Sequence, residues 1–172
     1  MFGFCYLEMD QLEKYANDLV SILYDNMEKI VPTGHNREFV FQTWFRINRE
    51  KLQNAERNTV IALQEESGEV AGFCQYSIHE NVLLMEEIQI KDSFQGKYHI
   101  FRNLYGFLLE HLGTEIEYVE AYVNKKNAKS MGVHSKLGLS IVGENQSGTC
   151  YHFRGTWSDV LNWYHGKIGS GE

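Results

Sequence analysis

Two adjacent carboxylates stand in the middle of an apolar run of the sequence. Glu86 and Glu87 interrupt residues 82–90, which otherwise have the composition of a buried strand. A carboxylate so placed can act as a general base, which removes a proton from a reacting group. Adjacent strand residues point to opposite faces, so only one of the two can serve one cleft unless a bulge intervenes. Alternation puts Glu86 on the face of Ile88 and Ile90. The same carboxylates could instead protect a strand edge or pair with the lysine that follows the run.

A glycine-containing loop follows this run and leads into a helical pattern. The first N–H groups of a helix have no partner inside the helix, and the helix dipole makes that end positive. A phosphate fits there when the backbone can be approached closely, which Gly96 permits. Lys97, His99 and Arg102 add positive character to a chain whose formal net charge is −7. The loop predicts an anion site, a weak signal on its own because many such turns bind nothing.

A third polar segment joins a later strand to a later helix. It runs over residues 124–130, and the helix that follows carries His134. Histidine titrates near neutrality, so His134 could give or take a proton during a reaction. A buried helix histidine with a purely structural role is the alternative.

Together these segments resemble the GNAT superfamily of acyl-CoA-dependent N-acyltransferases. That family has a strand, a loop of the form Gln/Arg-x-x-Gly-x-Gly/Ala and a helix, which residues 90–100 resemble. Its later motif is Asn-x-x-Ala/Ser, then Tyr or His, then Lys-Leu-Gly-Phe. Here that motif is Asn127 to Ser130, His134 and the segment 136–139, which reads Lys-Leu-Gly-Leu. The resemblance covers residues 59–155 well and the first 58 residues only through their number of helices.

The loop departs from the family at Tyr98 and Ile100, which replace small residues. The first residues of a helix have φ near −60°, which any L-residue adopts. We therefore expect the backbone amides to remain available, with less room for phosphates beside them.

The resemblance implies a role for each of these residues. The pyrophosphate of acetyl-CoA would lie on the amides of residues 95–100, and the pantetheine arm would pair with the backbone of Ile88 and Ile90. An amide near Ile88 would hold the thioester oxygen, and Asn127 would touch the pantetheine. His134 would protonate the leaving thiolate. The expected catalytic residues are Glu86, Glu87 and His134. The expected acetyl-CoA-binding residues are Ile88, Ile90, Gln95, Gly96, Lys97, Tyr98, His99, Ile100, Arg102, Asn127 and Ser130.

The hydrophobic periodicity predicts the elements that position these groups. Helices are expected at residues 10–30, 37–56, from Gly96 to 112, at 127–137 and at 158–165. Strands are expected at residues 59–64, 70–79, 82–90, 116–123, 139–144 and 149–154. Asp10 with Glu13 resembles a capping box, and Gly113 suits a left-handed position after a helix. The fold class is α/β: a mixed, mostly antiparallel sheet with a central parallel strand–helix–strand crossover, flanked by helices.

Composition restricts the remaining choices. The 172 residues predict one domain, with a helical part at 1–58, a sheet core at 59–155 and a helix and loose tail at 156–172. No apolar run reaches the roughly 20 residues of a membrane span, and no secretory signal is recognisable. The negative net charge argues against non-specific nucleic-acid binding, which relies on Lys and Arg contacts to phosphate. Three separated cysteines fit a cytoplasmic protein without a metal site.

The family resemblance implies an N-acetyltransferase that uses acetyl-CoA, and the composition adds the expectation of a cytoplasmic location and no metal. The acceptor would be a primary amine of a small molecule or peptide, and the family resemblance adds the expectation of a homodimer. Two alternatives stay open. The fold could serve as a non-catalytic acyl-CoA-binding or regulatory module, or as an interaction domain whose loop binds nothing.

Overall fold

The computed structural model describes residues 1–166, so the loose tail expected at the C-terminus lies outside the described residues. The chain forms two compact units. Unit 1 comprises residues 1–77 and 87–104, and unit 2 comprises residues 78–86 and 105 onward. The boundary crosses β4 between Glu86 and Glu87. The prediction of a single domain stays a prediction.

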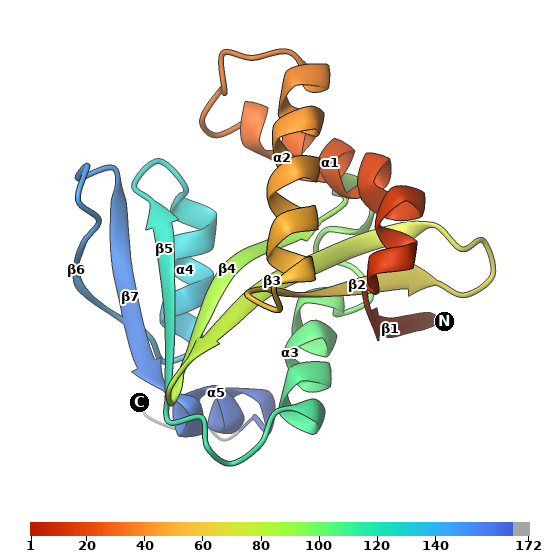
Figure 1. Ribbon diagram of the computed structural model, residues 1–172. Helices are drawn as coiled ribbons and strands as arrows, with labels where there is room; N and C mark the ends of the chain where they lie inside the picture. Colours follow the sequence, from red (N-terminus) through yellow and green to blue (C-terminus); the bar gives the residue numbers. More distant parts are fainter. Residues whose placement is uncertain (167–172) are drawn as a thin grey trace. The chain divides into compact units, whose positions relative to one another are not determined.

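The elements follow one another in the order expected, with one strand added at the start (Figure 1). The strands are β1 (Phe2–Tyr6), β2 (Asn58–Gln64), β3 (Val70–His79), β4 (Val82–Ile90), β5 (Tyr118–Asn124), β6 (Ser140–Glu144) and β7 (Cys150–Thr156). The helices are α1 (Leu12–Glu28), α2 (Arg37–Gln53), α3 (Ile100–His111), α4 (Ala128–Lys136) and α5 (Trp157–Tyr164), with short 3₁₀ turns η1 (Met9–Gln11) and η2 (Asp92–Phe94).

The strand order is β1-β2-β3-β4-β5-β7-β6. β4 and β5 are parallel, whereas the pairs β1/β2, β2/β3, β5/β7 and β6/β7 are antiparallel. The mixed, mostly antiparallel sheet with a parallel pair flanking a helix is therefore confirmed. Within residues 1–166, no helix is long and apolar enough to cross a membrane.

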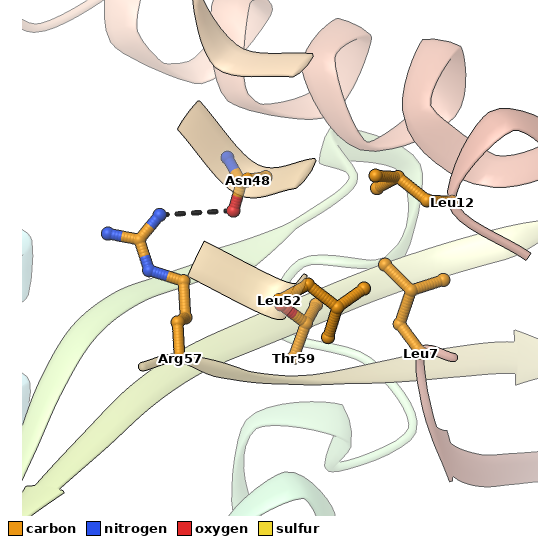
Figure 2. Close-up of a pocket in the computed structure, with 6 residues that line it drawn as sticks. All are labelled: Leu7, Leu12, Asn48, Leu52, Arg57 and Thr59. Atoms are coloured by element: carbon orange, nitrogen blue, oxygen red, sulfur yellow. Dashed lines mark hydrogen bonds between the residues drawn. The ribbon is translucent and has the colours of Figure 1, made fainter. Parts of the chain in front are cut away.

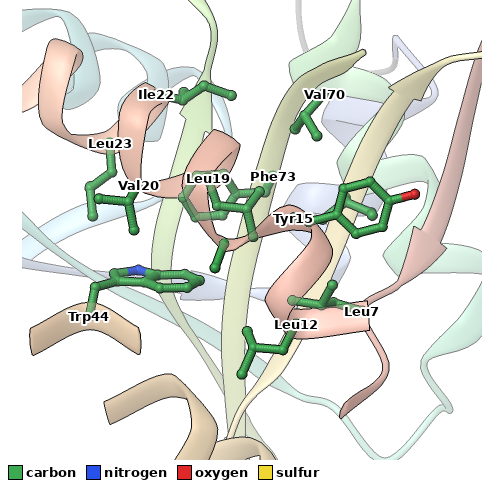
Figure 3. Close-up of a cluster of buried hydrophobic side chains, with 12 residues drawn as sticks. Leu7, Leu12, Tyr15, Leu19, Val20, Ile22, Leu23, Trp44, Val70 and Phe73 are labelled. Atoms are coloured by element: carbon green, nitrogen blue, oxygen red, sulfur yellow. The ribbon is translucent and has the colours of Figure 1, made fainter. Parts of the chain in front are cut away.

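Unit 1 has its core between α1, α2 and one face of β2 and β3. Leu19 of α1 and Phe73 of β3 are fully buried (Figure 3). Ile61 of β2, the register partner of Phe73, is fully buried as well. Trp44 of α2 packs against the same cluster. The apolar stripe of α1 recurs every three or four residues, so it covers this face along its whole length.

A buried polar network fixes α2 to the strands. Asn48 donates to the Trp44 carbonyl at 2.9 Å and accepts from Gln75 at 2.7 Å and from Arg57 at 3.0 Å. Gln75 also donates to Thr59 at 3.0 Å. The Arg57–Asn48 bond lies beside a small pocket (Figure 2). Because this pocket has no room for even a water molecule, we interpret the network as structural.

Unit 2 is built on the parallel pair and the β6–β7 hairpin. Leu83 and Met85 of β4 pair with Val119 and Ala121 of β5, and all four are buried. Phe153 of β7 pairs with Ala121 and is buried on the same face. Alternation therefore gives each of these strands one apolar face and one face with polar residues.

One strand was missed and two local predictions were wrong. β1 was not expected, because a short edge strand gains its hydrogen bonds only from its partner β2. α1 is not capped by Asp10 and Glu13; it follows the turn η1, where the Gln11 side chain accepts the Glu8 N–H at 3.3 Å. Gly113 does not have a positive φ. Its missing β-carbon instead leaves space for the Glu115 carboxylate, with which an added β-carbon would collide.

Candidate functional site

The two carboxylates of β4 lie in different units and have different surroundings. Both are half-buried. Glu87 accepts a hydrogen bond from the Gln89 side chain at 2.6 Å, and Gln89 in turn accepts from Asn26 of α1 at 2.7 Å. Glu87 is therefore held in a chain of side-chain amides in unit 1. The Lys91 ammonium, the alternative partner expected for these carboxylates, contacts Glu69.

Glu86 belongs to the polar face of unit 2. Leu84 pairs with Glu120 in the parallel register, and Met85, next along β4, is buried against Ala121. Strand alternation then puts Glu86 on the same face as Leu84 and Glu120. Of the two carboxylates, Glu86 is the one whose face carries further polar side chains of β5.

Hydrogen bonds join the end of β4 to α1 and to the loop between β4 and α3. The carbonyl of Ile90 accepts hydrogen bonds from Asn26 and from Gln95, each at 3.0 Å. Gln95 also donates to the Asn26 side-chain oxygen at 3.2 Å. Asn26 thus bonds both strand and loop, and Gln95 acts here as an anchor of the loop.

Asn26 and Gln89 were not expected to matter. Asn26 stands three residues after Leu23 and seven after Leu19, which puts a polar side chain on the apolar face of α1. That misplaced polarity was a signal available from the sequence. Its partners lie more than 60 residues away, so the contact itself could not be inferred.

Two backbone amides of the loop between β4 and α3 make hydrogen bonds within the loop itself. The amide of Gln95 donates to the Asp92 carbonyl and that of Lys97 to the Phe94 carbonyl, each at 3.2 Å. These two amides therefore belong to the turn. The Lys97 ammonium bonds the Ser93 carbonyl at 3.2 Å.

Helical geometry at Tyr98 was expected and is wrong. Tyr98 has φ +58° and His99 φ +53°, after Gly96 at φ +69°, and α3 begins only at Ile100. The carbonyl of His99 accepts the first bond of the helix, from Asn103 at 2.9 Å. Two successive left-handed residues that are not glycine cost roughly 1–2 kcal/mol each, so the surroundings must compensate for them.

At Tyr98, an aromatic cluster supplies contacts that compensate for the strain. The Tyr98 ring lies 5.2 Å from the ring of Phe2 and 6.2 Å from that of Phe94, and Phe2 meets Phe94 edge-on at 5.6 Å. Tyr98 remains 59% exposed. Ile100, by contrast, is buried, so its side chain belongs to the core and takes no room from a ligand.

The second motif is built as a regular helix start. The Asn127 side-chain oxygen accepts the Ser130 N–H at 3.0 Å, which makes Asn127 the N-cap of α4. Its Nδ2 group is not used in this cap. Asn124 supports the approach by accepting the Lys126 N–H at 2.9 Å, and the carbonyl of Asn124 accepts the Asn127 N–H at 2.8 Å.

His134 is buried one turn further along α4. Its Nδ1 lies 2.8 Å from the Ser130 carbonyl, which can only accept, so Nδ1 carries the proton and Nε2 the lone pair. Its ring packs against Phe153 at 5.6 Å. Burial lowers the pKa of His134 below its usual value, although the Ser130 bond acts in the opposite direction.

The structure divides the expected residues between the units. Unit 1 holds Glu87, Ile88, Ile90, Arg102 and the loop from Gln95 to Ile100, whereas unit 2 holds Glu86, Asn127, Ser130 and His134. Lys97, His99 and Arg102 are exposed. No cluster that could hold a metal ion occurs among residues 1–166. Cys74 is fully buried and burial raises its pKa to about 12, which makes it a poor nucleophile.

Comparison with solved structures identifies the fold. The chain resembles the PaiA N-acetyltransferase of Thermoplasma acidophilum in complex with coenzyme A, with a TM-score of 0.69, 16% identity, and coverage of 91% of this chain and 99% of that one. The chain has the GNAT fold. A GNAT acetyltransferase of Staphylococcus aureus gives a TM-score of 0.69 at 9% identity, covering 91% and 99% of the two chains.

A third GNAT-fold neighbour is Arabidopsis thaliana NAA60 in complex with a bisubstrate analogue. Its TM-score is 0.59 at 14% identity, and the alignment covers 91% of this chain and 98% of that one. No family model and no curated protein matches the sequence. The GNAT resemblance of the two sequence motifs is thus confirmed at the level of the fold.

Proposed function

We propose that this protein is an N-acetyltransferase that transfers the acetyl group of acetyl-CoA to a primary amine by direct attack in a ternary complex. The observation that carries the proposal is the order along β4: two half-buried carboxylates, then a strand end, then the loop that opens α3. This order stands in the GNAT fold, of which one solved example is bound to coenzyme A. The acceptor would be a small molecule or a peptide.

On the donor side, the loop holds the pyrophosphate through the amides of Tyr98, His99 and Ile100. The amides of Gln95 and Lys97 are used within the turn, so they contribute by shaping it. Ile88 carries most of the backbone pairing to the pantetheine, because the Ile90 carbonyl already accepts two bonds. Lys97, His99 and Arg102 add positive charge. The contact of Asn127 with the pantetheine, which the family resemblance implies, stays a prediction.

On the acceptor side, Glu86 is the base. The ammonium gives one proton to the Glu86 carboxylate, and the neutral nitrogen attacks the thioester carbonyl. The carbon–sulfur bond then breaks, and the expelled thiolate takes the second proton from the protonated amide nitrogen. The protons balance without a separate acid. Glu87, whose carboxylate is held by Gln89, is the alternative base.

His134 is the weaker part of the predicted set. A general acid must be protonated before it acts, and burial lowers the pKa of His134. With the proton on Nδ1 donated to Ser130, the ring presents a lone pair on Nε2. We propose that His134 acts by fixing the first turn of α4, where Asn127 and Ser130 lie.

The charge of the acceptor, the cellular compartment, the partners and the oligomeric state stay predictions. A net charge of −7 favours a cationic acceptor through electrostatic steering. A cytoplasmic enzyme, with no nucleic-acid or membrane partner and with a homodimeric state, would fit the composition and the family resemblance.

Ligand-dependent unfolding tests the donor site. A ligand at about 100 times its Kd adds roughly 2.7 kcal/mol, which in a chain of this size raises Tm by roughly 5–10 °C. We expect that rise with acetyl-CoA and with free CoA, and no rise with ATP. The absence of a shift at millimolar acetyl-CoA would contradict the proposal and favour an interaction domain.

Matched glutamine variants test the base. Glu86→Gln should lower kcat at pH 7 by roughly 10²–10⁴-fold, and Glu87→Gln by much less. The deficit of Glu86→Gln should shrink as the pH approaches the amine pKa of about 10.4, because solvent then supplies the neutral amine. Transfer that survives replacement of both carboxylates would remove the base assignment.

A second candidate function rests on Tyr98. A bulky side chain at a position where the family has a small residue, with two loop amides already used, favours a module that binds acyl-CoA and does not turn it over. A Tm shift with acetyl-CoA, combined with no acetyl transfer to a broad panel of primary amines, would support this reading over the enzyme.

A further inference from the structure

One face of unit 2 carries aromatic and charged side chains whose arrangement no part of the proposed reaction has used. In the β5/β7 register, Tyr122 pairs with His152 and Glu120 with Arg154. Alternation puts these four side chains and Tyr118 on one face of the two strands. The opposite face carries the buried residues Ala121 and Phe153.

The groups on this face are fixed by one another. Glu120 accepts a hydrogen bond from Arg154 at 2.7 Å, and its other oxygen lies 3.1 Å from Nε2 of His152. The Arg154 guanidinium lies over the Tyr118 ring at 4.2 Å. The side chains of Glu120 and His152 are only 16% and 20% exposed. A carboxylate held between two basic groups is already satisfied, so its role here is to orient them.

Tyr122 is the exception, because much of it is open. Its ring stacks on the imidazole of His152 at 4.6 Å with an angle of 13° between the planes, and 48% of the residue is exposed. The imidazole supports one side of a flat ring. The stack therefore offers a rigid aromatic surface of low conformational entropy, which suits a second aromatic ring.

Glu86 follows directly after the last register pair of β4 and β5, Met85 with Ala121, and Tyr122 is its counterpart on β5. Leu84 pairs with Glu120, so the next same-face residues are Glu86 on β4 and Tyr122 on β5. When the ammonium group of the acceptor gives its proton to Glu86, the rest of the acceptor molecule would lie over β5, near Tyr122. Counting the charged side chains named on this face, two carboxylates and one guanidinium give a formal sum of −1, which complements a monocation.

We infer that Tyr122 determines acceptor specificity, and that the acceptor is a primary amine carrying an aromatic ring that stacks on Tyr122. This inference rests on the proposed function, since it places the reacting nitrogen at Glu86. His152 and Glu120 are positioning residues, which hold Tyr122 flat through the imidazole stack.

Two amines of nearly equal shape and basicity test the inference. 2-Phenylethylamine has an aromatic ring, and 2-cyclohexylethylamine has a saturated one. We expect kcat/KM to be about 5–10-fold higher for the aromatic amine, as befits one aromatic pair. Tyr122→Ala should abolish that preference, and Tyr122→Phe should keep it. Ile141→Ala is the matched control, because Ile141 is 51% exposed and pairs with Phe153 on the opposite face.

The outcomes separate the inference from the function. Equal turnover of both amines by the unchanged protein, or a preference that survives Tyr122→Ala, overturns the inference and leaves the acetyltransferase intact. If no amine is acetylated, calorimetric titration of both amines decides, with and without CoA. Tighter binding of 2-phenylethylamine that depends on Tyr122 supports the inference, and its absence overturns it. Absence of the acetyl-CoA-dependent Tm shift counts against the proposed function alone.

Discussion

Two strand-to-helix junctions of this protein are held in place by different kinds of contact. The junction from β5 to α4, in unit 2, is local: Asn127 caps the helix through Ser130, three residues away. The junction from β4 to α3, in unit 1, depends on distant residues. Asn26 of α1 holds its start, and Phe2 of β1 packs against its left-handed Tyr98.

The difference explains why only one junction could be read from the sequence. An N-cap asparagine and the helix after it form a short-range pattern, and their geometry follows from residue types. A tyrosine with φ +58° has no such pattern, because the conformation is unfavourable by itself and persists only through contacts made in the folded chain. The following changes should separate the two junctions experimentally.

The largest effect is expected from Asn26→Ala. This change removes two hydrogen bonds that Asn26 donates, to Gln89 and to the Ile90 carbonyl, and one that it accepts from Gln95. At about 0.5–1.5 kcal/mol each, we expect the free energy of unfolding to fall by roughly 2–3 kcal/mol. Urea unfolding measures it.

The neighbouring Asp25→Ala serves as the control for Asn26→Ala. Asp25 is exposed and pairs with Arg37 at the surface, where an ion pair contributes at most about 1 kcal/mol. Equal losses in the two variants would mean that Asn26 does not hold the loop.

A smaller effect is expected at Tyr98, where two substitutions should differ in an unusual order. Tyr98→Ala loses the ring contacts to Phe2 and Phe94 but keeps a β-carbon at positive φ, so we expect a loss of about 1–2 kcal/mol. Tyr98→Gly loses the same contacts but relieves the strain, and should be about 1 kcal/mol more stable than Tyr98→Ala.

Chemical denaturation of both Tyr98 variants, without ligand, measures this order. If Tyr98→Gly were the less stable variant, the positive φ would not be costing the protein stability. The Gly96→Ala variant gives an independent measure of that cost, because Gly96 has φ +69° and an added β-carbon would meet no other atom within 4 Å.

The elements that the sequence could predict are again those that depend on local patterns. β3 and β4 were predicted to the residue, because their apolar runs are bounded by turn residues. α4 was predicted within one residue at each end, by Asn127 and by Gly138, which has φ +88°. β1 and the true start of α3 were missed, since both depend on partners that lie far away in the sequence.

The candidate site divides in the same way. Residue types in order along the chain predict Glu86, Glu87, the loop and His134 as site residues. They could not show that Gln89 holds Glu87, or that the Ser130 carbonyl fixes the tautomer of His134. Those facts depend on side-chain geometry, which periodicity does not contain.

At the local junction, Asn127→Ala should cost about 1 kcal/mol of unfolding free energy, because the Ser130 N–H loses its acceptor. Asn127→Asp should remain close to the unchanged protein, since aspartate caps helices equally well. Thermal unfolding without ligand compares the three proteins. A loss as large for aspartate as for alanine would show that Asn127 acts through something other than its cap.

The smallest effect is a pH dependence from His134, also on α4. Burial lowers its pKa in the folded state, so between that value and the ordinary 6.5 the unfolded chain binds more protons. Its contribution to stability is therefore complete above about pH 6.5 and is lost as the pH falls through the folded-state pKa. Urea unfolding at pH 7.5 and pH 5.5 should show a smaller drop for His134→Gln than for the unchanged protein. Glutamine cannot take up the proton, and its amide can still donate to the Ser130 carbonyl. An equal drop in the two proteins would mean that His134 binds protons equally well in the folded and unfolded chain. It would also restore His134 as a candidate acid, because an unhindered imidazolium could protonate the departing thiolate.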